Sequence, residues 1–317
     1  MAPAPAIPVP QNRLGAWLRL MRASNAPTVV SGALLGAGVG AAAAPGGAPP
    51  VGLMLWVAAA CTAIYLSGMV MNDYFDQAVD RRQRPTRPLV SGEVSEHAAL
   101  LMAMLLLACG VVVLSVASPP TLPWTLLLVS AVMAYNLLHQ SPLAGPPLMA
   151  VCRGLVPTLA AIACAPGQRP DWDLVGYFAL PLAVYTLAVS IVARHEVEDG
   201  AADLVGSGLR PSIGVGLAAV SLAMPFGAVA MGALGMPPRG SLLGYVAILM
   251  VAMGVLLRGL LLLVQPARGP AGVMTWIAGM SLMDAAGLLL LGQSWLAAAA
   301  VGCAVIARLL QRRIAGS

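Results

Sequence analysis

The stretch N-D-Y-F-D-Q-A-V-D-R-R-Q-R-P-T-R (residues 72–87) follows directly on the uncharged run 51–71. It places three carboxylates, Asp73, Asp76 and Asp80, where a membrane-spanning helix is expected to leave the lipid. Their spacing of three and then four residues aligns them on one face of the helix if it continues. Because like charges aligned in this way repel, the pattern indicates a bound cation. Magnesium is the natural candidate, since it prefers carboxylate oxygens and leaves positions open for phosphate.

A second stretch repeats this pattern 123 positions further along the chain. Glu196, Asp199 and Asp203 have the same spacing of three and then four residues after another apolar run. In both copies an Arg-Pro pair follows, and its arginine, Arg87 or Arg210, lies seven residues after the last carboxylate. The matched spacing indicates an internal repeat in which the chemistry is kept and the apolar flanks differ.

The composition indicates an integral membrane protein. Hydrophobic residues make up 59% of the 317 residues and charged residues only 9%. Apolar runs of about 20 residues recur along the chain, which matches the thickness of the hydrocarbon layer. The net charge of +5 comes from arginines in the loops between these runs, so it does not indicate a nucleic-acid partner.

We therefore predict an all-α, polytopic membrane bundle of nine to ten transmembrane helices in a ring around a central cavity, built as an internal repeat of helix pairs. Residues 1–14 are rich in proline and are predicted to form a disordered tail that is not a signal peptide. Residues 15–317 are predicted to form a single integral membrane domain. The expected spans are 26–44, 51–72, 98–117, 121–138, 143–165, 174–193, 212–236, 241–265, 271–291 and 293–308.

The distribution of arginine predicts the orientation in the membrane. Both acidic stretches fall in connections between an even and an odd span, so they share one side. Fifteen of the 17 arginines lie at the termini or near the loops of that same side, and only Arg169 and Arg239 lie on the other. Since positive charge accumulates on the cytoplasmic side, both acidic stretches are expected to face the cytoplasm of a cell (inner) membrane.

Three ionisable residues lie inside the expected spans. Arg153 and Arg258 are near cytoplasmic ends, where each either snorkels to the interface or faces the interior of the bundle. Asp284 lies deeper and has no evident partner in the sequence.

The motif N-D-Y-F-D-Q-A-V-D resembles the N-D-x-x-D-x-x-x-D signature of the UbiA-type intramembrane prenyltransferases, and the resemblance extends over about residues 15 to 290. L-R-L-M-R-A-S-N-A-P-T (18–28) looks like the entry to the first helix of that family, with Arg22 and Asn25 in the matching places. Y-N-L-L-H (135–139) lies where the family often has a tyrosine followed four residues later by lysine, so His139 replaces that lysine. The stretch 194–200 looks closer to the EboC-like branch.

The resemblance implies the transfer of a prenyl group from a prenyl diphosphate to an aromatic or other lipophilic acceptor within the membrane, with Mg²⁺ as cofactor. Implied catalytic residues are Asp76, Asp80, Asp199, Asp203 and Tyr135. Implied metal ligands are Asn72, Asp73, Asp76, Asp80, Glu196, Asp199 and Asp203. Implied substrate contacts are Arg22, Asn25, Arg87, Arg153, Arg210 and His139, since arginine fits phosphate oxygens.

Three other functions compete with this interpretation, and the residues do not support them equally. A transporter is expected to bind its substrate near the middle of the membrane, whereas these carboxylates gather at one surface. A CDP-alcohol phosphotransferase needs a D-G-x-x-A-R core, and the positions after Asp199-Gly200 hold Asp203 and Leu204 where Ala and Arg are required. A non-catalytic relative that binds isoprenoids or organises a pathway is compatible with the departures at His139 and Glu196.

Overall fold

The computed structural model describes residues 13–42, 47–203, 218, 240–263, 265 and 268–314, and for Gln168 and residues 195–203 it describes the backbone only. The described part of the chain is helical and contains no strand. Its elements are α1 (Arg13–Leu20), η1 (Ala23–Asn25), α2 (Ala26–Ala41), α3 (Val51–Phe75), α4 (Gln77–Gln83), α5 (Glu96–Ala117), η2 (Pro119–Thr121), α6 (Leu122–Leu138), α7 (Gly145–Cys164), η3 (Pro166–Gln168), α8 (Trp172–Asp203), α10 (Leu242–Leu263), α11 (Gly269–Leu290) and α12 (Ser294–Arg313).

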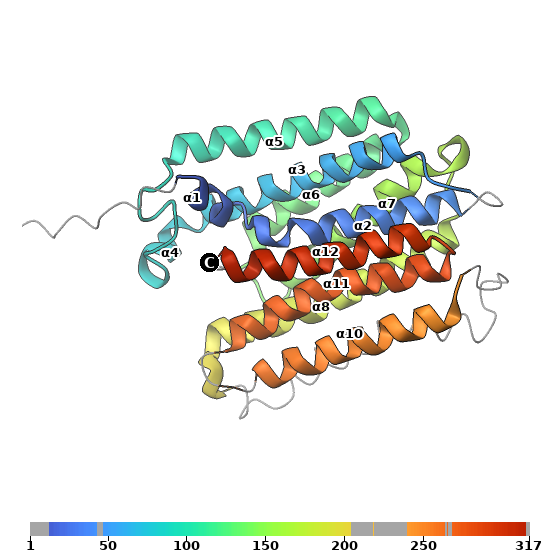
Figure 1. The fold of residues 1–317 in the computed structure, drawn as a ribbon. Helices are drawn as coiled ribbons and strands as arrows, with labels where there is room; N and C mark the ends of the chain where they lie inside the picture. Colours follow the sequence, from blue (N-terminus) through green and yellow to red (C-terminus); the bar gives the residue numbers. More distant parts are fainter. Residues whose placement is uncertain are drawn as a thin grey trace, which may run out of the picture.

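The long helices run roughly parallel or antiparallel to one another and form one bundle (Figure 1). Eight of them, within the described residues, are long and apolar enough to cross a membrane: α3, α5, η2 with α6, α7, the first part of α8, α10, α11 and α12. The expected last span, 293–308, falls on α12, whose 20 residues are long and apolar enough to cross a membrane. The expected span 212–236 lies outside the described residues. The expected domain start at residue 15 falls inside α1, which begins at Arg13.

The first expected span, 26–44, is a shorter helix of 16 residues, α2, which is buried along nearly its whole length. Small residues explain how it fits at the centre of the bundle. A methyl group on Gly36 would lie 2.1 Å from the carbonyl oxygen of Pro157 in α7, and one on Gly40 would lie 2.3 Å from that of Ala161. Glycine at every fourth position thus allows two helix backbones to touch, as is common in membrane bundles.

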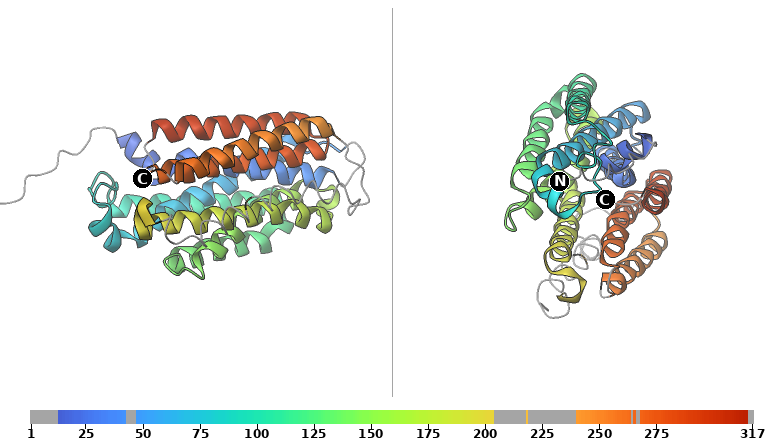
Figure 2. Two further views of the ribbon diagram at one scale, coloured as in Figure 1. Left: turned by 90° about the horizontal axis from the view of Figure 1, so that it is seen from below. Right: turned by 90° about the vertical axis from the view of Figure 1, so that its left-hand side faces the viewer.

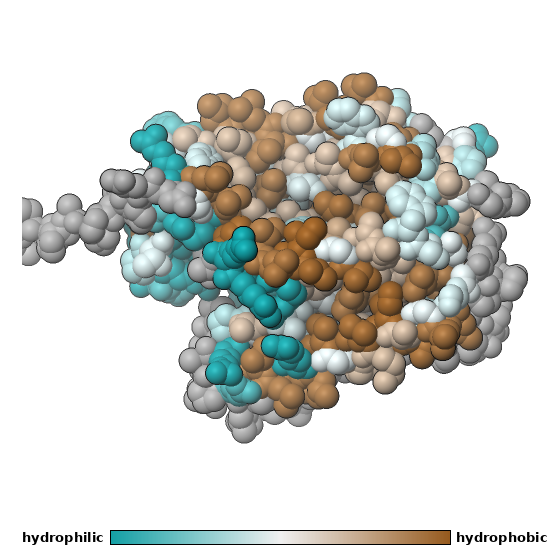
Figure 3. Space-filling model, viewed as in Figure 1, coloured by the Kyte–Doolittle hydropathy of each residue, from teal (hydrophilic) through white to brown (hydrophobic). Residues whose placement is uncertain are grey.

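The surface of the bundle divides into an apolar flank and a polar end. α5 and α10 expose large apolar side chains such as Leu105 and Met250, as expected of helices that face lipid. Hydrophilic residues gather at the end that carries α1 and α4 (Figure 3). Seen from that end, the long helices stand side by side in one bundle (Figure 2). Within it α2 packs against α3, α7, α8, α11 and α12.

The ends of α3, α6, α8 and α12 all lie at the polar end, together with α1 and α4 (Figure 1). The acidic stretches lie at the C-terminal ends of α3 and α8, so both stretches lie at the same end of the bundle. This arrangement agrees with the prediction that both acidic stretches share one side of the membrane.

Candidate active site

The first acidic stretch does not continue as one helix. α3 ends at Phe75 and α4 begins at Gln77, with Asp76 between them; its N–H still donates to the carbonyl of Asn72 at 3.0 Å. Asp73 therefore belongs to α3 and Asp80 to α4, so the condition for three carboxylates along one face, a helix that continues, is not met. At the bend at Asp76, Asp73 and Asp80 both lie against Arg87, whereas Asp76 lies against His139 at the end of α6.

Asp73 is buried and paired with two arginines. It accepts a hydrogen bond from Arg22 at 3.1 Å and forms a close ion pair with Arg87, which also lies 3.3 Å from Asp80. Asp73 and Arg87 are only 1% and 4% exposed. Neither lines the cavity described below, so Asp73 as a metal ligand and Arg87 as a phosphate contact gain no support from this geometry. Their positions instead fit a buried ion pair in which the charge of Arg87 balances that of Asp73 and stabilises the fold.

Arg22 adopts a left-handed backbone conformation, with φ 45° and ψ 45°, immediately before η1. Such a conformation costs a residue other than glycine about 1–3 kcal/mol. The cost is offset by contacts, since its guanidinium also donates to Asn72 Oδ1 at 3.0 Å and its carbonyl accepts from the Tyr65 hydroxyl at 3.2 Å. Burial lowers the pKa of Arg22, but Asp73, Tyr135 and Tyr65 together outweigh this effect and the pKa is raised.

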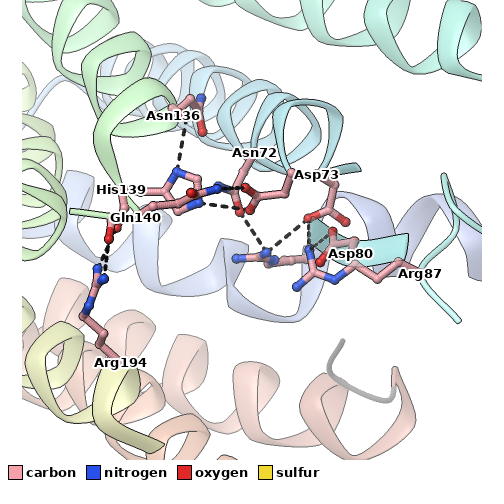
Figure 4. Close-up of polar contacts among 10 residues, drawn as sticks. Asn72, Asp73, Asp80, Arg87, Asn136, His139, Gln140 and Arg194 are labelled. Atoms are coloured by element: carbon pink, nitrogen blue, oxygen red, sulfur yellow. Dashed lines mark hydrogen bonds and ion pairs between the residues drawn. The ribbon is translucent and has the colours of Figure 1, made fainter. Parts of the chain in front are cut away.

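Asp76 turns toward the end of α6. His139 Nε2 lies 3.0 Å from one carboxylate oxygen, and Gln140 donates to the other at 3.2 Å (Figure 4). Burial raises the pKa of Asp76, but the hydrogen bond and charge of His139 outweigh it and the pKa is lowered. The same hydrogen bond raises the pKa of His139 against the effect of burial. The two pKa shifts favour the charged forms of the His139–Asp76 pair, at the position where the UbiA resemblance implied a lysine.

Arg194 connects α8 to this pair. Its guanidinium donates to the carbonyl of His139 at 2.9 Å and to that of Gln140, at the C-terminal end of α6 (Figure 4). Arginine at this position satisfies carbonyls that have no partner within the helix. Arg194 lies two positions before Glu196, so the second acidic stretch begins close to the residues that hold Asp76. The side chains of Glu196, Asp199 and Asp203 lie outside the description, and Arg210 lies outside the described residues.

A cavity of about 520 Å³ opens beside these residues. Its walls come from η1, α3, α4, α6, α7, α8 and α11, so it occupies the centre of the polar half of the bundle. The predicted site residues that line it are Arg22, Asn25, Asn72, Asp76, Asp80, Tyr135, His139 and Arg153. Apolar residues, among them Met69 and Ile277, complete the walls. Arg153 stands 5.5 Å from the ring centre of Tyr65, which places it inside the bundle.

The oxygen-rich part of this cavity suits a hard cation. Asn72, Asp76 and Asp80 line it and offer carboxylate and amide oxygens, the ligands that Mg²⁺ prefers. Burial and the neighbouring carboxylates raise the pKa of Asp80 against the opposite effect of Arg87. Within the part of the chain whose side chains are described, no three His, Cys, Asp or Glu residues come together closely enough to hold a metal.

The family is established by comparison with known proteins. The model of the UbiA prenyltransferase family matches residues 33–277, which is most of the chain. This chain belongs to the UbiA prenyltransferase family. It is a multi-pass membrane protein, as the apolar helices of the bundle also show. The EboC-like branch stays a prediction.

Relatives of this UbiA-family chain include a digeranylgeranylglyceryl phosphate synthase of Haloquadratum walsbyi, which is 32% identical over 182 residues. That match covers 57% of this chain and 61% of the relative, so the chain spans less than two-thirds of the length of that protein.

Solved structures show the same fold. A UbiA homologue from Aeropyrum pernix K1 has a TM-score of 0.59 at 16% identity, over 82% of this chain and 96% of that one. A UbiA homologue from Archaeoglobus fulgidus, bound to GPP and Mg²⁺, has a TM-score of 0.53 at 16% identity, over 87% and 99% of the two chains.

Several residues of this UbiA-family chain were missed by the sequence analysis. Tyr65 lies seven positions before Asn72 on α3, so helical periodicity could have placed both on the cavity side. Gln140 and Arg194 carry no such signal, because the side chain of Gln140 donates to Asp76 from 64 positions away and Arg194 donates to backbone carbonyls at the end of α6. Asp284 does have a partner, Ser31 of α2, which donates to it at 2.6 Å from 253 positions away.

Proposed function

We propose that this chain transfers a prenyl group from a prenyl diphosphate to a lipophilic acceptor within the membrane, with Mg²⁺ as cofactor. The observation that carries the proposal is the cavity in which cationic and acidic side chains meet apolar walls. A prenyl diphosphate has the same two parts, a highly charged head and a hydrocarbon tail. The UbiA family and its GPP- and Mg²⁺-bound homologue support this match.

The head group is proposed to lie among Arg22, Arg153, Asn72, Asp76 and Asp80. Arginine binds phosphate oxygens through its planar fork of N–H groups, which favours Arg22 and Arg153 as contacts. Asn72, Asp76 and Asp80 are proposed to hold Mg²⁺ together with Glu196, Asp199 and Asp203 of the second stretch. Bound there, the cation would neutralise the diphosphate as it leaves.

Other residues of the cavity are proposed to protect and stabilise the reacting carbon. The apolar walls exclude water, which would otherwise capture an allylic cation. Tyr135 lines the cavity, and its ring face is proposed to stabilise the positive charge that develops on that carbon. His139 and Gln140 fix the orientation of Asp76 through the contacts described above.

The acceptor is proposed to be lipophilic and to carry a nucleophilic group. The Haloquadratum walsbyi relative is named for a product with two geranylgeranyl groups on glyceryl phosphate. A glyceryl phosphate with one geranylgeranyl ether is therefore one class to test, and aromatic acceptors are the other.

The test is an assay of membranes that contain the protein. Labelled farnesyl, geranylgeranyl and longer diphosphates are offered with each class of acceptor, with and without a chelator. We expect transfer that disappears with the chelator and returns when Mg²⁺ is added. Transfer that is indifferent to the chelator would contradict the metal-dependent mechanism, and absence of transfer from every donor would contradict the proposed function.

We also propose that the cavity faces the cytoplasm of a cell (inner) membrane, on the strength of the arginine distribution. α12 ends at the same end of the bundle as the acidic stretches (Figure 1). A reporter that is active only in the cytoplasm is therefore expected to work when fused after Ser317. If a reporter that is active only outside the cytoplasm works at that position instead, the proposed orientation is wrong.

A further inference from the structure

The side-chain amide of Asn136, in the last turn of α6, is buried without a partner. It is only 2% exposed, and neither its oxygen nor its nitrogen has a hydrogen-bond partner among the described residues. In Figure 4 only its backbone carbonyl joins the polar network, by accepting from His139 Nδ1 at 3.2 Å. A buried amide that is left unpaired destabilises the fold, so its presence points to a group that pairs with it.

Asn136 lines a second cavity, of about 50 Å³, between α3, α6 and α7. The deeper walls of this side pocket are apolar and include Ile64, Leu128, Val132 and Val156. The side pocket adjoins the large cavity, since both are lined by Tyr65, Met69, Tyr135, Met149 and Arg153. A molecule in the side pocket is therefore next to the site proposed for the diphosphate.

The hydrogen-bonding groups of the Asn136 amide limit which chemical groups can pair with it. Its nitrogen donates two hydrogen bonds and its oxygen accepts them. A hydrocarbon tail offers no partner, and an ionised phosphate accepts only, which leaves the amide oxygen unpaired. A hydroxyl group both donates and accepts, so it can satisfy both ends of the amide.

We infer that the side pocket is a binding site for the acceptor and that Asn136 binds a neutral hydroxyl group of that molecule. This inference rests on the proposed function and names the chemical class of the acceptor. Because the side pocket has room for only a few atoms, only the hydroxyl-bearing end of the acceptor enters it, next to Asn136, and the rest of the acceptor lies in the adjoining large cavity. The prenyl tail of the donor then occupies the large cavity.

The main competing occupant of the side pocket is an ordered water molecule. A buried water usually makes about three hydrogen bonds to polar groups. Besides Asn136, the polar residues that line the side pocket are Tyr65, Tyr135 and Arg153, and the Tyr65 hydroxyl already donates to the carbonyl of Arg22. The remaining walls are apolar, which favours the end of an acceptor that carries one hydroxyl over a water molecule, and the experiment separates the two.

The experiment compares the wild-type chain with Asn136→Leu, which keeps the size of the side chain and removes its hydrogen bonding. Transfer from geranylgeranyl diphosphate is measured to a glyceryl phosphate with one geranylgeranyl ether and to 4-hydroxybenzoate. We expect Asn136→Leu to raise the KM for the acceptor about tenfold and to leave the KM for the donor within about twofold. The matched control is Leu137→Ala, at an exposed neighbouring position, which should change neither KM.

A second readout tests the hydroxyl itself. An analogue of the glyceryl phosphate acceptor that lacks the free hydroxyl is used as a competitive inhibitor. Wild-type protein should bind it about tenfold more weakly than the hydroxylated acceptor, and Asn136→Leu should bind the two equally. If Asn136→Leu does not fold, Asn136→Asp, which keeps the shape and the acceptor atoms but not the donor, is measured in the same way.

Unchanged acceptor KM in a folded Asn136→Leu variant would overturn the inference in favour of a bound water. A lower KM for the donor would overturn it in favour of the prenyl tail in the side pocket. If the wild-type chain transfers to neither acceptor, the proposed function and this inference are both overturned. If the wild-type chain is active and Asn136→Leu shows an unchanged acceptor KM or a lower donor KM, only the inference is overturned.

Discussion

Replacing Asp76 with alanine is expected to reduce prenyl transfer by at least about a thousandfold while the protein stays folded. Asp76 lines the large cavity, and its carboxylate is held by His139 and Gln140, so it is presented to the substrate in a fixed orientation. Removing it takes away one proposed cation ligand and leaves His139 without its partner. The rate of transfer is measured at saturating donor and Mg²⁺.

Two further variants make this result specific. Asp173→Ala, at an exposed position in the first turn of α8, should leave the rate unchanged. Asp76→Asn keeps the shape of the side chain but removes its charge, so it should be nearly as inactive as Asp76→Ala. A rate above about one-tenth of wild type in both Asp76 variants would remove this residue from the catalytic mechanism.

The sequence was sufficient to predict the class of fold and the common end of the two acidic stretches. Both inferences rest on strong signals: apolar runs as long as the membrane is thick, and identical spacing of carboxylates after two of those runs. Arg22, Asn72 and Tyr135 were placed at one site by the resemblance to the UbiA family and not by these patterns, because a family resemblance ties together residues far apart in the chain.

The partners of each charge could not be predicted in the same way. Spacing alone suggested three equivalent carboxylates, but the bend at Asp76 gives Asp73 to two arginines and Asp76 to the end of α6. Which partner each carboxylate has depends on how helices far apart in the sequence pack against one another. Arg194 reaching the carbonyl of His139, and Ser31 reaching Asp284, are further cases in which no local pattern marks the contact.

Replacing Arg87 with alanine is expected to lower the free energy of unfolding by about 3–5 kcal/mol. Arg87 is 4% exposed and lies between the carboxylates of Asp73 and Asp80, which are 1% and 3% exposed. Its removal leaves Asp80 buried without a cation and leaves Asp73 with Arg22 alone. The change is measured by unfolding in detergent without added divalent cations, since a bound cation would partly replace the lost charge.

The control is Arg82→Ala, at an exposed position of α4, which should change the free energy of unfolding by no more than about 0.5 kcal/mol. The double variant Arg87→Met with Asp80→Asn should recover part of the loss, because it removes the uncompensated charge along with its partner. The original expectation for Arg87, contact with the diphosphate, makes the opposite prediction: Arg87→Ala would unfold like wild type and would show a raised KM for the donor. The two measurements together therefore decide whether Arg87 stabilises the acidic bend or binds the substrate.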